Sequence, residues 1–294
     1  EVVIPAEIDG MPVTSIGSRA FYEHGLTTIT IPDSVTSIGS NAFDGCTGLT
    51  SITIPEGVTS IGSYAFSGCT ALEDVKVEGV YTFLGDYAFS GCSSLTNVIL
   101  PEGYSDAYIG NSVFGGCEAL SPLYNSTTFF YMPNNGAESY TIPEGITTIA
   151  KNAFSESKSI KNLHLPSSIT YFSSGAFASS NIEELDLSNL EYVSLGAGVF
   201  TNSAIRNFIS PQKITNCPQN AFENCKNLVE LDLSGIRQIP GVTYFGNMGI
   251  GDGAFRGCEN LTNVIMPVSV GRLDIGQEAF KNCISLETID LSPR

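Results

Sequence analysis

An alanine-phenylalanine pair, followed three residues after the phenylalanine by cysteine, recurs along this chain, as in Ala65-Phe66-Ser67-Gly68-Cys69. The phenylalanines in this phase, most of them 22 to 25 residues apart, are Phe21, Phe43, Phe66, Phe89, Phe114, Phe154, Phe177, Phe200, Phe222, Phe255 and Phe280. A repeat of about 20 to 50 residues is typical of a solenoid, whose coils bury their apolar faces against neighbouring coils. We therefore expect a single solenoid over residues 1–294, with about 11 repeats of ~23 residues.

One unit, residues 49–69, predicts the structure of each coil. Its sequence is LTSITIPEGVTSIGSYAFSGC, in which Ile52 and Ile54 alternate with polar residues and Pro55 follows. This pattern favours a short strand with one buried face, ended by the proline. A second short extended piece ends at Gly62, and the Ala-Phe segment suits a helical or 3-10 turn because it is too short for a full helix. Stacked coils would form one parallel sheet, with the extended pieces and turns on the other side.

An insertion divides the repeats into a run at 1–120, a spacer at about 121–142 and a second run at 143–294. Within the spacer, Asn134-Asn135-Gly136 follows Phe129-Phe130-Tyr131-Met132 and precedes Tyr140-Thr141-Ile142. Because Asn-Gly favours tight turns, we expect a hairpin around it.

A second insertion, at about 238–250, is expected to leave the second run as a loop. Loops on solenoids often carry binding specificity, and the alternative is a tolerated spacer. The chain also begins and ends within a repeat, as though cut from a longer protein.

The charge balance is strongly acidic, with 30 Asp and Glu residues against 13 Lys and Arg and a formal net charge of −17. A field of that sign repels phosphate backbones, so we do not expect nucleic-acid binding. The sequence also has no apolar run long enough to cross a bilayer.

Seven of the eight cysteines stand three residues after an anchor phenylalanine: Cys46, Cys69, Cys92, Cys117, Cys225, Cys258 and Cys283. We expect each to be a small buried group whose thiol reaches nearby backbone, which predicts a reduced ladder rather than a disulfide framework. Cys217 is out of phase and lies eight residues before Cys225, so a local bridge between these two is an alternative. No Cys-x-x-Cys pair occurs, and we expect no metal site.

Neither a catalytic site nor a cofactor site is predicted. The two histidines, His24 and His164, have no recognisable catalytic partner. The glycine-rich run Gly246–Gly253 resembles a phosphate-binding loop, but its Ile-Gly-x-x-Ala-Phe belongs to the repeat and no Lys-Ser or Lys-Thr follows.

The outward side chains of the predicted strands are the candidate contact residues, because alternation points them away from the core. They are Asp74, Glu184, Asp186, Asn207, Ile209, Glu230, Asp232, Asn263, Ile265 and Asp290. This face is acidic with apolar islands. A cationic protein partner is one interpretation and a solvated face is the other, whereas calcium is not expected because straight strands lack a ligand-gathering loop.

The string IPxxVTSIGxxAFxGCxxLxxIxIP, seen from Ile31 to Pro55, resembles the BspA-like, or Treponema-type, leucine-rich repeat family. The likeness covers almost the whole chain. It implies an α/β solenoid, a right-handed leucine-rich-repeat horseshoe, from a bacterial cell-surface or secreted protein. Ser157, Ser180 and Ser203 replace the cysteine in the middle units, where a small side chain still fits.

Together, the residues and the resemblance predict a non-catalytic protein-binding or adhesion module at the cell surface or outside the cell. We expect a monomer that engages a protein partner, such as a host matrix or cell-surface protein, through the sheet face and insertions, without membrane insertion. One alternative is a carbohydrate-binding module that uses Tyr81, Tyr104, Tyr108, Tyr124 and Tyr131, although the chain lacks Trp. Others are a passive stalk and the non-catalytic region of a larger enzyme.

Overall fold

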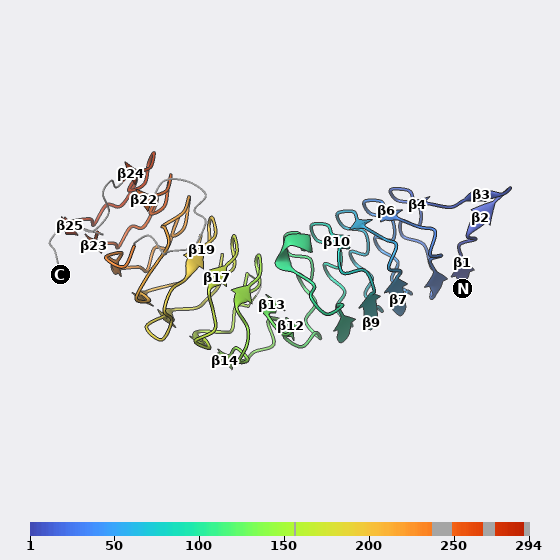
Figure 1. The fold of residues 1–294 in the computed structure, drawn as a ribbon, viewed down its shortest axis with the longest axis horizontal. Helices are drawn as coiled ribbons and strands as arrows, with labels where there is room; N and C mark the ends of the chain where they lie inside the picture. The colour runs from blue at the N-terminus through green and yellow to red at the C-terminus, as the bar shows by residue number, and fades with distance from the viewer. Residues whose placement is uncertain (156, 237–248, 267–273, 291–294) are drawn as a thin grey trace. The chain divides into compact units, whose positions relative to one another are not determined.

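The computed structural model describes residues 1–155, 157–236, 249–266 and 274–290, so most of the loop predicted at about 238–250 lies outside the described residues. The chain forms two compact units, Glu1–Asn135 (unit 1) and Gly136–Arg294 (unit 2), which are coloured in sequence order in Figure 1. Each unit is a stack of coils made of short strands and turns. Whether the two units form one continuous, right-handed, horseshoe-shaped solenoid stays a prediction.

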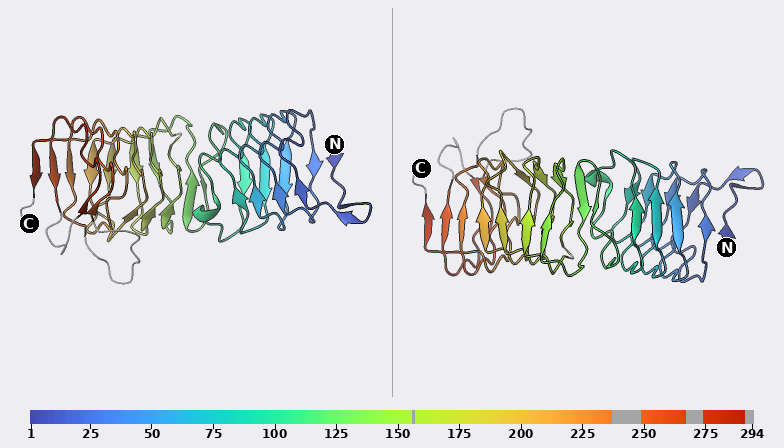
Figure 2. Two further views of the ribbon diagram at one scale, coloured as in Figure 1. Left: turned by 90° about the horizontal axis from the view of Figure 1, so that it is seen from above. Right: turned by 90° about the horizontal axis from the view of Figure 1, so that it is seen from below.

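Unit 1 has two rows of parallel strands, and the strands within a row lie side by side in Figure 2. The first strand row, which follows the Leu-x-x phase of each repeat, contains β1 (Val2–Val3), β5 (Ile29–Thr30), β7 (Ser51–Ile54), β9 (Asp74–Val77) and β11 (Asn97–Ile99). The second strand row contains β4 (Ser15–Ile16), β6 (Ser37–Ile38), β8 (Ser60–Ile61) and β10 (Phe83–Leu84). Parallel stacking is confirmed, and the second extended piece of each repeat also forms parallel strands, so the prediction of one sheet was too simple.

Unit 2 repeats this arrangement. Its first strand row contains β14 (Ser139–Thr141), β16 (Asn162–His164), β18 (Glu184–Asp186), β20 (Asn207–Ile209), β21 (Glu230–Asp232), β23 (Asn263–Ile265) and β25 (Thr288–Asp290). The second contains β15 (Thr148–Ile149), β17 (Tyr171–Phe172), β19 (Ser194–Leu195), β22 (Gly249–Ile250) and β24 (Asp274–Ile275). Isolated parallel bridges at Ile214 lie between β19 and β22 in this second row.

The Ala-Phe segments form non-helical turns and not the 3-10 or α-helical turns that we predicted. The assignment to the α/β class is therefore wrong. Among the described residues, the one helix is the three-residue 3-10 helix η1 (Asp106–Tyr108). In each coil whose Ala-Phe segment is fully described, residues with positive φ bracket the segment, such as Asn41 (57°) and Gly45 (74°), and a right-handed helix cannot pass through them. The Phe43 amide instead donates to the Ala65 carbonyl of the next coil at 2.7 Å. The turns thereby form a third hydrogen-bonded row.

The core of each unit is a stack of phenylalanines. Successive anchor rings are near parallel, with centroids 4.9 Å apart for Phe43 and Phe66 and 5.0 Å apart for Phe200 and Phe222. Beside this stack, every cysteine of the ladder donates its thiol to a phenylalanine carbonyl of the preceding coil, as Cys69 does to Phe43 at 3.2 Å. The predicted thiol-to-backbone contact is confirmed.

The spacer hairpin exists, but its turn lies elsewhere than predicted. β12 (Leu123–Tyr124) pairs antiparallel with β13 (Thr128–Tyr131), so the turn is at residues 125–127 and not at Asn134-Asn135-Gly136. The Asn125 side-chain oxygen accepts hydrogen bonds from the Thr127 and Thr128 amides at 3.0 and 2.8 Å. This local turn closes the hairpin before the Asn-Gly pair is reached.

A second hairpin, near the start of unit 1, was not predicted. β2 (Glu7–Ile8) pairs antiparallel with β3 (Met11–Pro12) through Asp9 and Gly10, which both have positive φ. The Asp-Gly pair is a strong signal for such a turn, and it stands outside the repeat phase.

Candidate binding groove on the first strand row

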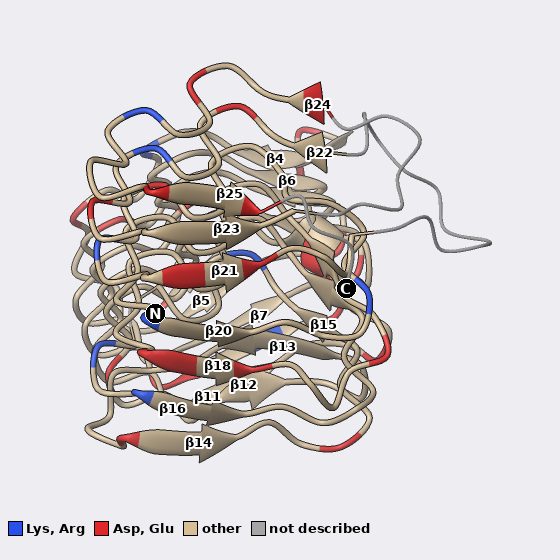
Figure 3. Ribbon diagram, turned by 90° about the vertical axis from the view of Figure 1, so that its left-hand side faces the viewer, with Lys and Arg blue, Asp and Glu red and all other residues tan. Residues whose placement is uncertain are grey.

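The outward positions of the first strand row are mostly exposed, as predicted. The side chains of Asp74, Glu184, Asp186, Asn207, Ile209 and Glu230 are exposed, and those of Asp232, Asn263 and Asp290 are half-buried. The rows that these residues form in unit 2 appear in Figure 3, in which β18 and β21 are red and β20 lies between them without an acidic residue.

Ile265 is an exception, because its side chain is only 3% exposed. We expected it to form an exposed apolar island like Ile209, which is 51% exposed. Ile265 stands on a central strand, in register with Asp232 on one side and Asp290 on the other. Side chains on both flanks leave it little contact with solvent, whereas Ile209 lies on the last strand of its sheet.

Acidic residues of this row are held by asparagines of the next strand. Asn207 Nδ2 donates to Glu184 Oε1, and Asn263 Nδ2 donates to Glu230 Oε1, both at 3.0 Å. Asn97 and Asp74 make the same contact in unit 1 at 3.0 Å. Such amide-carboxylate pairs orient the acidic side chains and separate the charges along the row.

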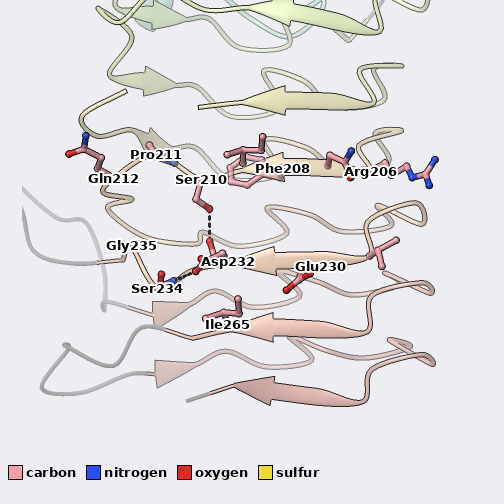
Figure 4. A pocket seen from close by; sticks show the side chains of 13 residues that line it. Arg206, Phe208, Ser210, Pro211, Gln212, Glu230, Asp232, Ser234, Gly235 and Ile265 are labelled. Carbon is pink, nitrogen blue, oxygen red and sulfur yellow. Dashed lines mark hydrogen bonds between the residues drawn. The ribbon is translucent and has the colours of Figure 1, made fainter. Parts of the chain in front are cut away.

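The first strand row of unit 2 is interrupted between β20 and β21. β20 ends the sheet β14-β16-β18-β20, and β21 begins the sheet β21-β23-β25. A groove of about 830 Å³ opens at this interruption. Figure 4 shows Arg206 at one end, Gln212 at the other, and Glu230 and Asp232 along β21.

Phe208 lies at the interruption. Its register partner on β18 is Leu185, and the same position on β21 is Leu231, so this strand alone of the three carries an aromatic ring inward. The ring packs edge-on against Phe200 and Phe222, with centroids 5.5 and 5.4 Å away. A ring needs more room than leucine, and this ring lies where the two strands separate.

The groove gathers half of the predicted candidates. Asn207, Ile209, Glu230, Asp232 and Ile265 line it. The other five candidates, Asp74, Glu184, Asp186, Asn263 and Asp290, lie elsewhere on the first strand rows.

Arg206, Ser210, Gln212 and Val229 also line the groove and were not predicted. They stand just before or after a strand, where alternation alone does not assign a direction. The Ser210 hydroxyl donates to the Asp232 carbonyl and joins the two walls.

Asp186 and Asp232 share a local motif at the ends of their strands. Each Oδ1 accepts a hydrogen bond from the backbone amide two residues later, of Ser188 and Ser234 respectively, at 2.8 Å. Hydrogen bonds from the hydroxyl and then the amide of Ser188 lower the pKa of Asp186. The carboxylate of Asp186 therefore stays ionised to a lower pH than that of an ordinary aspartate.

The five tyrosines considered for sugar stacking do not form one surface. Tyr104 and Tyr131 are buried, at 1% and 5% exposure, and their rings belong to the core of unit 1. Tyr81 packs edge-on against Tyr108, and Tyr124 stacks on Phe129. Only part of the predicted aromatic set is therefore accessible to a ligand.

The cysteines are structural groups. Burial raises the pKa of Cys46 to about 11 and that of Cys225 to about 12. For Cys69, a hydrogen bond with the Cys92 thiol raises the pKa most, and burial adds to it. Thiols with raised pKa values stay protonated and unreactive at neutral pH. All eight cysteines are unpaired, so the structure does not contain the alternative bridge between Cys217 and Cys225.

Two further features of the described residues bear on function. No group of three or more His, Cys, Asp or Glu side chains there could hold a metal ion. The three-residue helix η1 is far too short to cross a bilayer, and no other helix occurs in those parts of the chain.

Comparison with protein families gives a match over almost the whole chain. A model of the BspA-type leucine-rich repeat region matches residues 14–135, 125–248 and 241–294, in six copies. It describes a repeat region and not an enzyme family. None of the curated proteins matches the chain.

Several solved structures are similar. A leucine-rich repeat protein from Eubacterium ventriosum is 22% identical with a TM-score of 0.57, over 98% of this chain and 84% of that one, and it supports the fold. A leucine-rich cell-surface protein from Faecalibacterium prausnitzii is 26% identical, with a TM-score of 0.45 over 98% and 86% of the two chains. The leucine-rich repeat protein of T. pallidum is 29% identical, with a TM-score of 0.42 over 68% and 74%.

Proposed function

Since this chain belongs to the BspA-type leucine-rich repeat family, we propose that it is a non-catalytic protein-binding module of a bacterial cell-surface or secreted protein. Its contact surface is the first strand row of unit 2, centred on the groove between β20 and β21. The partner is a protein with a positively charged surface, such as a host matrix or cell-surface protein. Binding to it would make the module an adhesion device.

The groove is the observation that carries this proposal. It is the place where outward residues of two strands, Asn207, Ile209, Glu230 and Asp232, line one concave surface. Concave sites with apolar walls and a few fixed polar groups are where proteins usually bind their ligands. The net charge of −17 favours fast encounter with a cationic partner.

The proposal is tested by reversing the charge of the row. A variant with Glu184, Asp186, Glu230 and Asp232 all changed to Lys is passed over immobilised purified extracellular-matrix proteins, and binding is measured by surface plasmon resonance. We expect the Kd of this variant to exceed that of the wild type at least about tenfold, because reversal turns charge attraction into repulsion.

The matched control reverses four exposed glutamates of unit 1, namely Glu7, Glu56, Glu73 and Glu118. It makes the same change in net charge away from the proposed surface and should leave most of the affinity. Equal binding by wild type and the first variant, with both folded by circular dichroism, would refute the proposed surface. Absence of protein binding together with hits on a glycan array would support the carbohydrate alternative, and absence of both would support a stalk.

A further inference from the structure

The shape of the groove favours a segment of chain over a flat protein surface. Its volume of about 830 Å³ falls within the range of about 300–1,000 Å³ that holds compact ligands. Its walls are the ends and edges of two neighbouring strands, β20 and β21, which are each three residues long. An occupant must therefore protrude and extend along the strands to contact both walls.

Two carboxylates of the groove each keep an oxygen available. Glu230 Oε1 accepts from Asn263 Nδ2 at 3.0 Å, and Asp232 Oδ1 accepts from the Ser234 amide at 2.8 Å. Glu230 Oε2 and Asp232 Oδ2 have no hydrogen-bond or ion-pair partner among the described residues. The engaged oxygens hold both carboxylates in place, which reduces the entropy that a ligand would lose on binding to the others. Both groups are suited to accept charge-assisted hydrogen bonds from Lys or Arg.

Apolar surface lies beside these carboxylates on both walls. Ile209 of β20 is 51% exposed, and Val229, the residue before β21, is 43% exposed. Both line the groove, with the nearly buried Phe208 and Ile265 beneath them. Large exposed aliphatic side chains on the two walls of one groove gain free energy when an apolar side chain covers them.

Given the binding role proposed above, we propose that the groove receives an extended peptide segment of the partner that carries a Lys or Arg near an aliphatic residue. The basic side chain binds the available oxygens of Glu230 and Asp232, and the aliphatic side chain contacts Ile209 and Val229. Arg206, at one end of the groove, repels a second basic residue there and so restricts where the positive charge sits.

The test selects peptides from a random-sequence library displayed on phage, with the whole chain as the immobilised target. We expect the selected peptides to share a Lys or Arg close to Leu, Ile or Val. Affinities of synthetic copies are then measured by fluorescence anisotropy for wild type, for E230Q/D232N, for I209S/V229S and for E7Q/D33N. The last variant is the matched control, because it neutralises one exposed glutamate and one exposed aspartate of unit 1, outside the proposed contact surface.

We expect Kd to rise about tenfold or more in E230Q/D232N and in I209S/V229S, and less than about twofold in E7Q/D33N. Selection of peptides without basic residues, or equal losses in the unit 1 and β21 variants, would overturn the peptide proposal. If the four-Lys variant of the first strand row of unit 2 loses protein binding while no peptide binds, the peptide proposal fails and the proposed function stands. If neither proteins nor peptides bind, both fail.

Discussion

At the scale of single residues, the phase of the repeat assigns a physical role to each position. Cys69 lies three residues after an anchor phenylalanine, is fully buried, and donates its thiol to the Phe43 carbonyl at 3.2 Å. Ser180 and Ser157 occupy the same phase in unit 2, but their buried hydroxyl oxygens have no hydrogen-bond partner. A serine oxygen is held closer to its own Cα than a cysteine sulfur is and reaches less far. An unsatisfied buried hydroxyl costs free energy, so these serines are weak points of the ladder.

Replacing Ser180 with Cys should therefore stabilise the protein. The longer side chain would reach the Phe154 carbonyl, following the pattern of the other coils, and remove a buried unsatisfied hydroxyl. We expect the free energy of unfolding to rise by about 1 kcal/mol in urea titrations under reducing conditions. Ser203→Cys is the control, because the Ser203 hydroxyl already contacts the Cys225 thiol at 3.5 Å, and it should gain less. A destabilised Ser180→Cys protein would show that reach is not what the serine lacks.

At the scale of elements, one core residue stands out where the strand row opens. Phe208 points inward from β20, and its ring packs edge-on against both Phe200 and Phe222. The strands on either side carry leucine at that position and remain paired with their other neighbours. The groove thus lies where the core carries an added ring, and we expect the volume of that ring to hold the two strands apart.

The substitution Phe208→Leu should close the groove and join β20 to β21. Amide hydrogen exchange at β21 should slow, because new strand hydrogen bonds would protect its amides, and any ligand of the groove should lose most of its affinity. The cost in stability should stay near or below about 1.5 kcal/mol, because the lost ring volume is recovered by approach of the strands. Faster exchange at β21 together with a larger loss of stability would instead mean that the ring only fills the core.

At the scale of the whole molecule, the periodic part of the structure could be predicted from the sequence and the aperiodic part could not. The stacked phenylalanines, the thiol contacts and the exposure of Glu184 and Glu230 all follow from phase, because each coil repeats the environment of its neighbour. The groove lies where β20 and β21 belong to separate sheets, and the burial of Ile265 depends on its flanking strands. Neither the groove nor the burial of Ile265 can be predicted from the sequence of a single repeat.

The division of the chain into two units leads to a prediction about cleavage. Unit 1 ends at Asn135 and unit 2 begins at Gly136, and Asn134, Asn135 and Gly136 are all exposed. Gly136 has a φ of +82°, which favours glycine and leaves no side chain to shield the backbone. Exposed segments of this kind between compact units are preferred sites of proteolysis.

Brief digestion of the native protein with a protease of broad specificity should therefore cut first within residues 132–138, as identified by mass spectrometry of the fragments. Both fragments should resist further digestion, because each unit keeps its own phenylalanine stack, from Phe21 to Phe114 and from Phe154 to Phe280. The turn at Asp9 and Gly10 is the internal comparison, since it has positive φ but is closed by paired strands, and it should be cut more slowly. First cuts inside a coil would contradict the exposure argument, and rapid loss of either fragment would show that this unit is not stable on its own.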